Sequence, residues 1–121
     1  MAEDRDISAI GIDAEPNRAL KPAVARLALR PAEARHLVPL ERDEPGLAWS
    51  ALVFCAKEAV YKAWYPTERR PLGFHDVEVT FEPVGHSFVA RILVADRAAL
   101  QLPGSYACDD GLLVAAVVVK A

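Results

Sequence analysis

Two short segments of this chain place charged side chains where they could act together. Near the N-terminus, Ile10-Gly-Ile-Asp-Ala-Glu15 carries two carboxylates, Asp13 and Glu15, within an otherwise apolar stretch. In a β-strand, residues two apart point to the same side, with Cα atoms about 6.6 Å apart. Two converging carboxylates supply the oxygen ligands that suit Mg²⁺ or Mn²⁺ rather than zinc. A strand end that only exposes its acidic residues to water has the same pattern, so both interpretations stay open.

The second segment is Phe54-Cys-Ala-Lys-Glu-Ala-Val-Tyr-Lys-Ala-Trp64. Helical spacing places Cys55, Glu58 and Lys62 on one stripe, and Glu58 and Lys62, four residues apart, face the same way. An ordinary Glu–Lys pair on a helix surface, contributing about 0.3–0.5 kcal/mol, has the same spacing. The pair by itself therefore does not distinguish a site from a solvated helix face.

Together the two segments contain the residue types that a phosphate-binding site needs. Glu58 could add a third carboxylate to a site begun by Asp13 and Glu15, with Lys57 and Lys62 bringing positive charge beside it. Three carboxylates, a divalent ion and two lysines suit a pyrophosphate substrate. This reading requires the strand and the helix to meet, which spacing alone does not establish.

The predicted helices and strands that would position these residues indicate an α+β fold, in which an antiparallel sheet packs with helices. Alternation predicts a strand over Ile7 to Glu15, with Gly11 on the same face as the two carboxylates. The run from Leu47 to Trp64 lacks Gly and Pro and predicts a helix that Pro66 ends. The other predicted elements are helices over 20–29 and 31–37, a polar loop over 39–46, strands over 76–82 and 88–94, and strands over 105–108 and 112–119 joined by Asp109-Asp110-Gly111. The last strand is almost entirely apolar, so we expect it to be central and covered on both faces.

Composition narrows the class of protein. The 121 residues suffice for one domain over 1–121, and the formal net charge of -3 argues against a general nucleic-acid binder. The longest apolar run, 112–119, is too short for a membrane span, and the acidic N-terminus is unlike a secretory signal. Two cysteines, Cys55 and Cys108, do not make a disulfide framework. We therefore expect reduced thiols and a cytoplasmic protein.

The two charged segments, extended by Ala63-Trp-Tyr-Pro66, resemble the paired signature of the 4'-phosphopantetheinyl transferase superfamily. The extension is similar to that of the Sfp-type branch, and of its actinobacterial members in particular. Sfp-type enzymes contain two similar halves in one chain, and this sequence resembles only the C-terminal half. The resemblance thus implies a phosphopantetheinyl transferase-like half-domain covering nearly the whole chain.

The resemblance also implies a reaction and a role for each charged residue. In that family a divalent ion, usually Mg²⁺, holds the pyrophosphate of coenzyme A, and its ligands match Asp13, Glu15 and Glu58. Glu58 also matches the residue proposed to draw the proton from a carrier-protein serine. Lys62 matches a lysine that contacts the phosphates, and Lys57 one that lies near the coenzyme. The serine hydroxyl would attack the β-phosphate, taking 4'-phosphopantetheine and releasing 3',5'-ADP.

The implied partners follow from the same resemblance. The acceptor would be an apo acyl or peptidyl carrier protein of fatty-acid, polyketide or nonribosomal-peptide synthesis. Because the half that supplies much of the adenine and 3'-phosphate site is missing, we expect a homo-oligomer or a separate partner chain. Two alternatives stay open, namely a module that only binds coenzyme A or a carrier protein, and a half subunit that is inactive without its partner.

Overall fold

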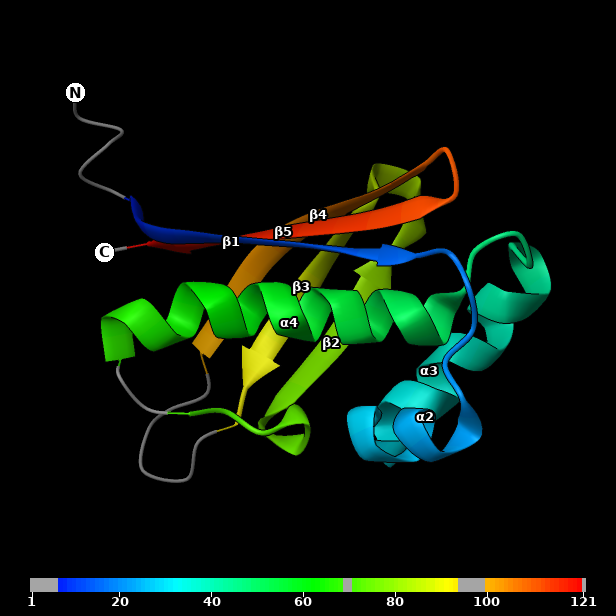
Figure 1. Cartoon of the computed structure of the whole chain (residues 1–121), viewed down its shortest axis with the longest axis horizontal. Helices are drawn as coiled ribbons and strands as arrows, with labels where there is room; N and C mark the ends of the chain where they lie inside the picture. Colours follow the sequence, from blue (N-terminus) through cyan, green and yellow to red (C-terminus); the bar gives the residue numbers. More distant parts are fainter. Residues whose placement is uncertain (1–6, 69–70, 94–99, 121) are drawn as a thin grey trace.

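The computed structural model describes residues 7–68, 71–93 and 100–120, which form an antiparallel sheet with a long helix across one face (Figure 1). The strand order is β1-β5-β4-β3-β2. The elements are β1 (Ile7–Pro16), α2 (Pro22–Ala28), α3 (Pro31–Asp43), α4 (Trp49–Glu68), the 3-10 turn η1 (Phe74–Asp76), β2 (Val77–Glu82), the 3-10 turn η2 (Pro83–Gly85), β3 (Ser87–Ile92), β4 (Leu100–Asp109) and β5 (Leu112–Lys120). The α+β prediction is confirmed.

Several predicted boundaries were wrong, and prolines account for most of the differences. α3 continues through Pro39 to Asp43, so the loop predicted over 39–46 begins too early. The helix persists because Leu37 and Leu40, on either side of Pro39, pack against the core. α4 likewise runs two residues beyond Pro66.

Strand β4 begins at Leu100 rather than at Ser105, as the sequence had indicated. Pro103 is tolerated because the register of β4 with β5 begins only at Gly104, so Pro103 pairs with β3 alone. Proline has no backbone N–H, so it is acceptable at a strand position where one side forms no hydrogen bonds with a neighbouring strand. At the other end of β4 the predicted hairpin turn is confirmed, with positive φ angles of 52° at Asp110 and 76° at Gly111. The predicted strand over 88–94 corresponds to β3, and Val94 lies outside the described residues.

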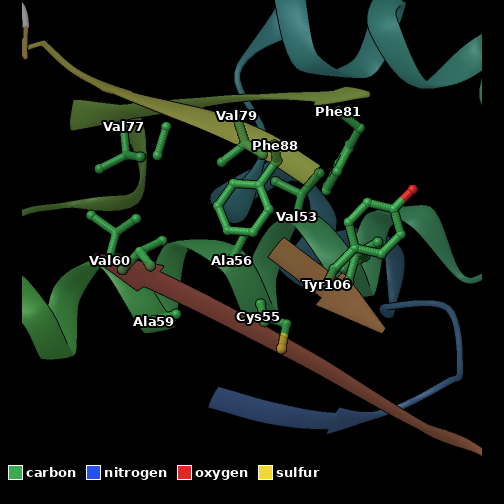
Figure 2. Packing of buried hydrophobic residues seen from close by; sticks show 14 of the residues in the cluster. Val53, Cys55, Ala56, Ala59, Val60, Val77, Val79, Phe81, Phe88 and Tyr106 are labelled. Atoms are coloured by element: carbon green, nitrogen blue, oxygen red, sulfur yellow. The ribbon is translucent and has the colours of Figure 1, made fainter. Parts of the chain in front are cut away.

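α4 supplies the centre of the core. Its buried side chains include Leu52, Val53 and Val60. Figure 2 shows Val53 and Val60 in one cluster with the sheet residues Val79 and Phe88. None of the helices in the described segments has the length and apolar content that a transmembrane span needs.

α3 lies at the free edge of β2 and not on the sheet face. At this edge its side chains accept hydrogen bonds from backbone N–H groups of β2.

The opposite face of the sheet is apolar along β1 and β5, and we call this β1–β5 part the outer face. β5 shows the asymmetry, because Leu113, Ala115 and Val117 are buried while the alternate residues between them are only partly buried. The prediction that β5 is covered on both faces was therefore wrong, although its position inside the sheet was right. On β1 the apolar side chains Ile10 and Ile12 point outward and are each 57% exposed. The register places Ile10, Ile12, Ala14, Val114, Ala116 and Val118 on this outer face. Beyond β5 the same side of the sheet mixes apolar with polar and charged residues, namely Ala107, Ser105, Pro103, Gln101, Ser87, Val89, Arg91, Glu78, Thr80 and Glu82.

β1 is held unusually close to α4 because Gly11 has no side chain. A Cβ atom at Gly11 would lie 1.9 Å from the carbonyl oxygen of Ala59 and 2.9 Å from the nitrogen of Ala63. Asn17, just beyond β1, accepts a hydrogen bond from the Ala48 N–H and donates one to the Gly46 carbonyl. The strand is thereby fixed to the start of α4 as well as to its middle.

Candidate functional site

The strand and the helix that carry the two charged segments do meet, and an ion pair joins them. Lys62 Nζ on α4 lies 2.7 Å from Asp13 Oδ1 on β1. Asp13 is only 8% exposed, because its face of β1 packs on α4. Its second carboxylate oxygen, Oδ2, is buried without a hydrogen-bond partner in the structure. A buried carboxylate oxygen without a donor is costly, and it can be satisfied by a ligand.

Glu15 and Glu58 belong to the same neighbourhood. Burial raises the pKa of Glu15 above its ordinary value, and the adjacent Asp13 side chain raises it further. The negative charges of Asp13 and Glu58 act in the same direction, whereas Lys62 opposes them. Negative charges raise a carboxyl pKa in this way only when they lie close to it. Asp13, Glu15 and Lys62 thus lie together, and Glu58 on α4 is near enough for its charge to act on Glu15.

Cys55, one turn before Glu58 on the predicted stripe, is not a nucleophile. Its Sγ donates to the Asp13 carbonyl oxygen at 3.2 Å, and the side chain is fully buried. Burial, followed by the charges of Asp13 and Glu15, raises the pKa of Cys55 to about 12. The thiol is therefore protonated at neutral pH, and it serves as a small core residue between α4 and the strands.

Lys57 lies apart from Asp13 and Lys62, on the side of α4 that faces α2 and α3. Its ammonium donates to Glu33 Oε1, to the Ala28 carbonyl and to the Phe74 carbonyl, each at 2.7 Å. An ammonium group has three protons to donate, and all three are used here. The side chain is 2% exposed.

A pocket opens directly beside Glu58. It has a volume of about 250 Å³, and one wall is formed by α4 residues Lys57, Glu58 and Tyr61. The other wall includes Leu72 and Phe74, which precede β2. The pocket is thus mostly apolar, with a carboxylate at one edge. Such a pocket suits an extended, weakly polar part of a ligand whose far end lies beside charged side chains.

The carboxylates fit a hard divalent cation in chemistry, but they do not form a closed ligand set. Asp13 Oδ2 is an unused buried oxygen, and Glu15 beside it is destabilised as an anion by its neighbours. Across the described residues, no three acidic, histidine or cysteine side chains are arranged as a metal-binding group. Mg²⁺ is often held by only one or two carboxylates, with water and substrate phosphates completing its shell. Asp13 and Glu15 fit that arrangement.

The residue that the sequence did not reveal is Glu33. It is 1% exposed, and its carboxylate pairs with Lys57. The available signal was its place at the third position of a helix that starts with Pro31, where glutamate commonly bonds back to the cap residue. The hydrogen bond from the Arg30 N–H to Glu33 Oε1, at 2.7 Å, is of this kind. Nothing local could indicate a partner 24 residues away.

Comparison with known proteins agrees with this geometry. Residues 9–115 match the family described as the 4'-phosphopantetheinyl transferase superfamily. The chain is 36% identical over 126 residues to the 4'-phosphopantetheinyl transferase Svp of Streptomyces mobaraensis, covering 100% of this chain and 51% of that protein. It is 38% identical over 124 residues to the 4'-phosphopantetheinyl transferase PptT of Mycobacterium tuberculosis (strain ATCC 25618 / H37Rv), covering 93% of this chain and 53% of that protein.

A third relative extends the same pattern. The chain is 34% identical over 130 residues to the 4'-phosphopantetheinyl transferase Npt of Nocardia iowensis, covering 97% of this chain and 57% of that protein. The chain therefore spans about half the length of the curated relatives that it matches. The match nevertheless includes both charged segments and residues of every strand that packs on α4. On these grounds the chain belongs to the 4'-phosphopantetheinyl transferase superfamily.

Proposed function

We propose that this chain transfers the 4'-phosphopantetheine group of coenzyme A to a serine of an apo acyl or peptidyl carrier protein. The bond that breaks joins the two phosphates of coenzyme A, and 3',5'-ADP leaves. The observation that carries the proposal is the Asp13–Lys62 contact between β1 and α4, with Glu15 beside it and with Glu58, whose charge acts on Glu15, lining an apolar pocket. The names of the relatives support the same reaction class.

Each residue of the cluster has a distinct part in this proposal. Asp13 and Glu15, with Glu58 as the third carboxylate, would hold Mg²⁺ or Mn²⁺. When bound, that ion neutralises charge on the pyrophosphate and favours departure of the leaving phosphate. Glu58 accepts the proton of the serine hydroxyl, directly or through water. Lys62 is 53% exposed at its side chain, so its ammonium can turn from Asp13 toward a phosphate oxygen.

The pocket beside Glu58 would take the pantetheine arm. This arm is a flexible chain of amide and methylene groups that leads directly to the phosphate under attack. An apolar pocket of about 250 Å³ would bury the arm while Glu58 stays at the reacting end. Lys57, which also lines the pocket, would contact the coenzyme here without its ammonium, since that group is occupied by protein acceptors.

Intact-protein mass spectrometry tests the reaction. An apo acyl carrier protein is incubated with the purified chain, coenzyme A and Mg²⁺, and Glu58→Gln serves as the matched variant. We expect a mass gain of one phosphopantetheine with the native chain and none with the variant. Circular dichroism of both proteins establishes that the variant is folded. An equal gain in the two samples would contradict the role of Glu58.

A chain that binds coenzyme A but transfers nothing would instead favour a binding module or a half subunit. Calorimetry with coenzyme A, in the presence and absence of Mg²⁺, separates these cases from a transferase. Binding without transfer that is rescued by a second, different chain identifies the half subunit. Binding without any rescue identifies the module.

We further propose that the outer face pairs with a second copy of the chain in the working enzyme. Its central residues on β1 and β5 are apolar, with Ile10 and Ile12 more than half exposed. An uncovered apolar sheet face of this kind usually marks an interface. The patch on two copies can pair about a two-fold axis because its residues from Ile10 to Ala14 and from Val114 to Val118 carry no charge that would repel. A monomeric mass at micromolar concentration would contradict this assembly, and a separate partner chain would then be required.

The cytoplasm remains the compartment that we propose. Cys55 and Cys108 are both free thiols, as expected in a reducing environment.

A further inference from the structure

Glu33 and Lys57 form a buried ion pair at the junction of several elements. Their side chains are 0% and 2% exposed, and Glu33 Oε1 lies 2.7 Å from Lys57 Nζ. Breaking such a pair by removing one partner is costly, because an unpaired charge stays in the interior. An ion pair that is kept in the interior of a small protein therefore calls for a specific structural or functional explanation.

Every polar atom of the pair has a partner, and each partner belongs to a different element. Lys57 Nζ donates to the Ala28 carbonyl at the end of α2 and to the Phe74 carbonyl in η1. Glu33 Oε2 accepts from the Val79 N–H on β2 at 2.7 Å. The pair thus ties α2, α3, η1 and β2 to α4, and it satisfies an N–H on the free edge of the sheet.

The pair also lies behind the pocket. Lys57 directly precedes Glu58 on α4, and both line the pocket. Phe74, whose carbonyl is held by Lys57, lines the opposite wall and stacks its ring on Phe54 with centroids 5.3 Å apart. The two walls are therefore joined through one ammonium group.

We propose that the Glu33–Lys57 pair is a positioning unit that sets the wall around Phe74 at a fixed distance from Glu58, and that the Lys57 ammonium does not bind phosphate. The second half of this statement follows from saturation, since a phosphate would have to displace one of three buried acceptors. The role in positioning rests on the proposed function, because it assumes that the pocket holds part of the substrate. Glu33 is then required for the reaction although it contacts neither the substrate nor the reacting atoms.

Thermal unfolding of Glu33→Gln, Lys57→Met and the double variant tests the pair itself. Each single change leaves one buried charge alone and should lower the melting temperature by more than about 10 °C. The double variant should lie above both single variants, because neither charge remains. The exposed residues Glu41 and Lys21 provide matched controls, Glu41→Gln and Lys21→Met, which should shift it little. A double variant no better than the singles would overturn the pairing.

Amide hydrogen exchange tests the positioning without any ligand. In the folded double variant, the Val79 amide and the amides of 73–77 should exchange about tenfold faster or more than in the native chain. The amides of α4 at Leu52 and Val53 should change little. Unchanged exchange over 73–79 would overturn the proposal, because the wall would then be held by other contacts.

Binding of two probes completes the test. In the double variant, pantetheine affinity should fall about tenfold or more, because the wall no longer matches its ligand. Affinity for Mg²⁺-pyrophosphate should stay within about twofold, because the Asp13 side of the site is intact. The reverse result would make Lys57 a phosphate ligand, and no change in either would leave the pair purely structural. Both results overturn the proposal. If native protein binds no pantetheine while exchange responds as expected, the proposed function fails and the positioning of the wall stands.

Discussion

Lys62 Nζ and Asp13 Oδ1 lie 2.7 Å apart across the contact between α4 and β1. The lysine is more than half exposed, whereas the carboxylate is nearly buried. The hydrogen bond and the charge of Asp13 raise the pKa of Lys62, so the ammonium stays protonated beside it. The carboxylate thus holds a cation already, and it keeps a second oxygen unused.

Substitution of Lys62 by methionine should separate metal binding from transfer. Removal of the competing ammonium should raise Mn²⁺ affinity by about two- to fivefold, as expected for one exposed ion pair. Transfer to the carrier protein should fall by about tenfold or more. Electron paramagnetic resonance of free Mn²⁺ measures the affinity, and Asp13→Asn, which should weaken binding, is the control. Weaker Mn²⁺ binding in Lys62→Met would show that the lysine organises the ligands.

Gly11→Ala should be among the most damaging single methyl additions in this chain. The added Cβ would lie 1.9 Å from the Ala59 carbonyl, so β1 must move away from α4. We expect a loss of about 3 kcal/mol in the free energy of unfolding, measured by urea denaturation. A Cβ atom at Gly46 would meet nothing within 4 Å, and Gly46→Ala should be neutral or stabilising by up to about 1 kcal/mol. Equal effects at the two glycines would refute the close contact.

Stability should depend on pH through Glu15. Because its pKa is raised in the folded chain, its contribution is fully present below pH 4.5 and is lost as the pH rises through the raised pKa. Glu15→Gln should therefore have a higher melting temperature than the native chain at pH 7 and an equal one at pH 4. Added Mg²⁺ should raise the melting temperature of the native chain more than that of the variant. A variant less stable than the native chain at pH 7, without metal, is the opposite outcome.

The two cysteines should differ sharply in reactivity. Cys55 is fully buried with a pKa of about 12, whereas Cys108 is exposed. A thiol reagent such as DTNB should modify one thiol per chain quickly at pH 8, and both after denaturation. Cys108→Ser should abolish this fast reaction and leave only the reaction of Cys55 that follows denaturation. A fast reaction that survives in Cys108→Ser would place Cys55 within reach of solvent.

Threonine at Ile10 and Ile12 should weaken assembly without unfolding the chain. Threonine keeps the β-branched shape that suits a strand, and both positions are 57% exposed. Sedimentation velocity at micromolar concentration should show a dimer for the native chain and a monomer for the double variant. Val84, 94% exposed in η2 and away from the outer face, provides the control Val84→Thr. Loss of the dimer in the control would point to a different interface.

The sequence predicted the positions of the charged residues better than their surroundings. The alternation of β1 placed Asp13 and Glu15 on one face of a strand, and the unbroken run in α4 placed Glu58 and Lys62 on one stripe of a helix. That the face and the stripe meet came only from the structure. The role of Lys57 was harder to predict, because its surroundings depend on Glu33 in another helix. Local spacing describes contacts within one element, and an interior ion pair joins elements that are distant in sequence.

The orientation of β1 was also beyond local rules. Alternation separates an apolar face with Ile10 and Ile12 from a face with Gly11 and Asp13, but hydrophobicity would place the first inside. The structure has the reverse, because the bare backbone at Gly11 allows the closer packing on α4. An apolar strand face that turns outward is understandable only when the partner that covers it is considered.

The central position of α4 has a consequence for how the protein would lose activity on heating. One helix carries the middle of the core, the Lys57 end of the buried pair, and the Glu58 and Lys62 side chains. Melting of α4 would therefore remove the core and these side chains in one step. A folded but inactive form would have to arise elsewhere, by opening of the edge strand β1, which carries Asp13 and Glu15.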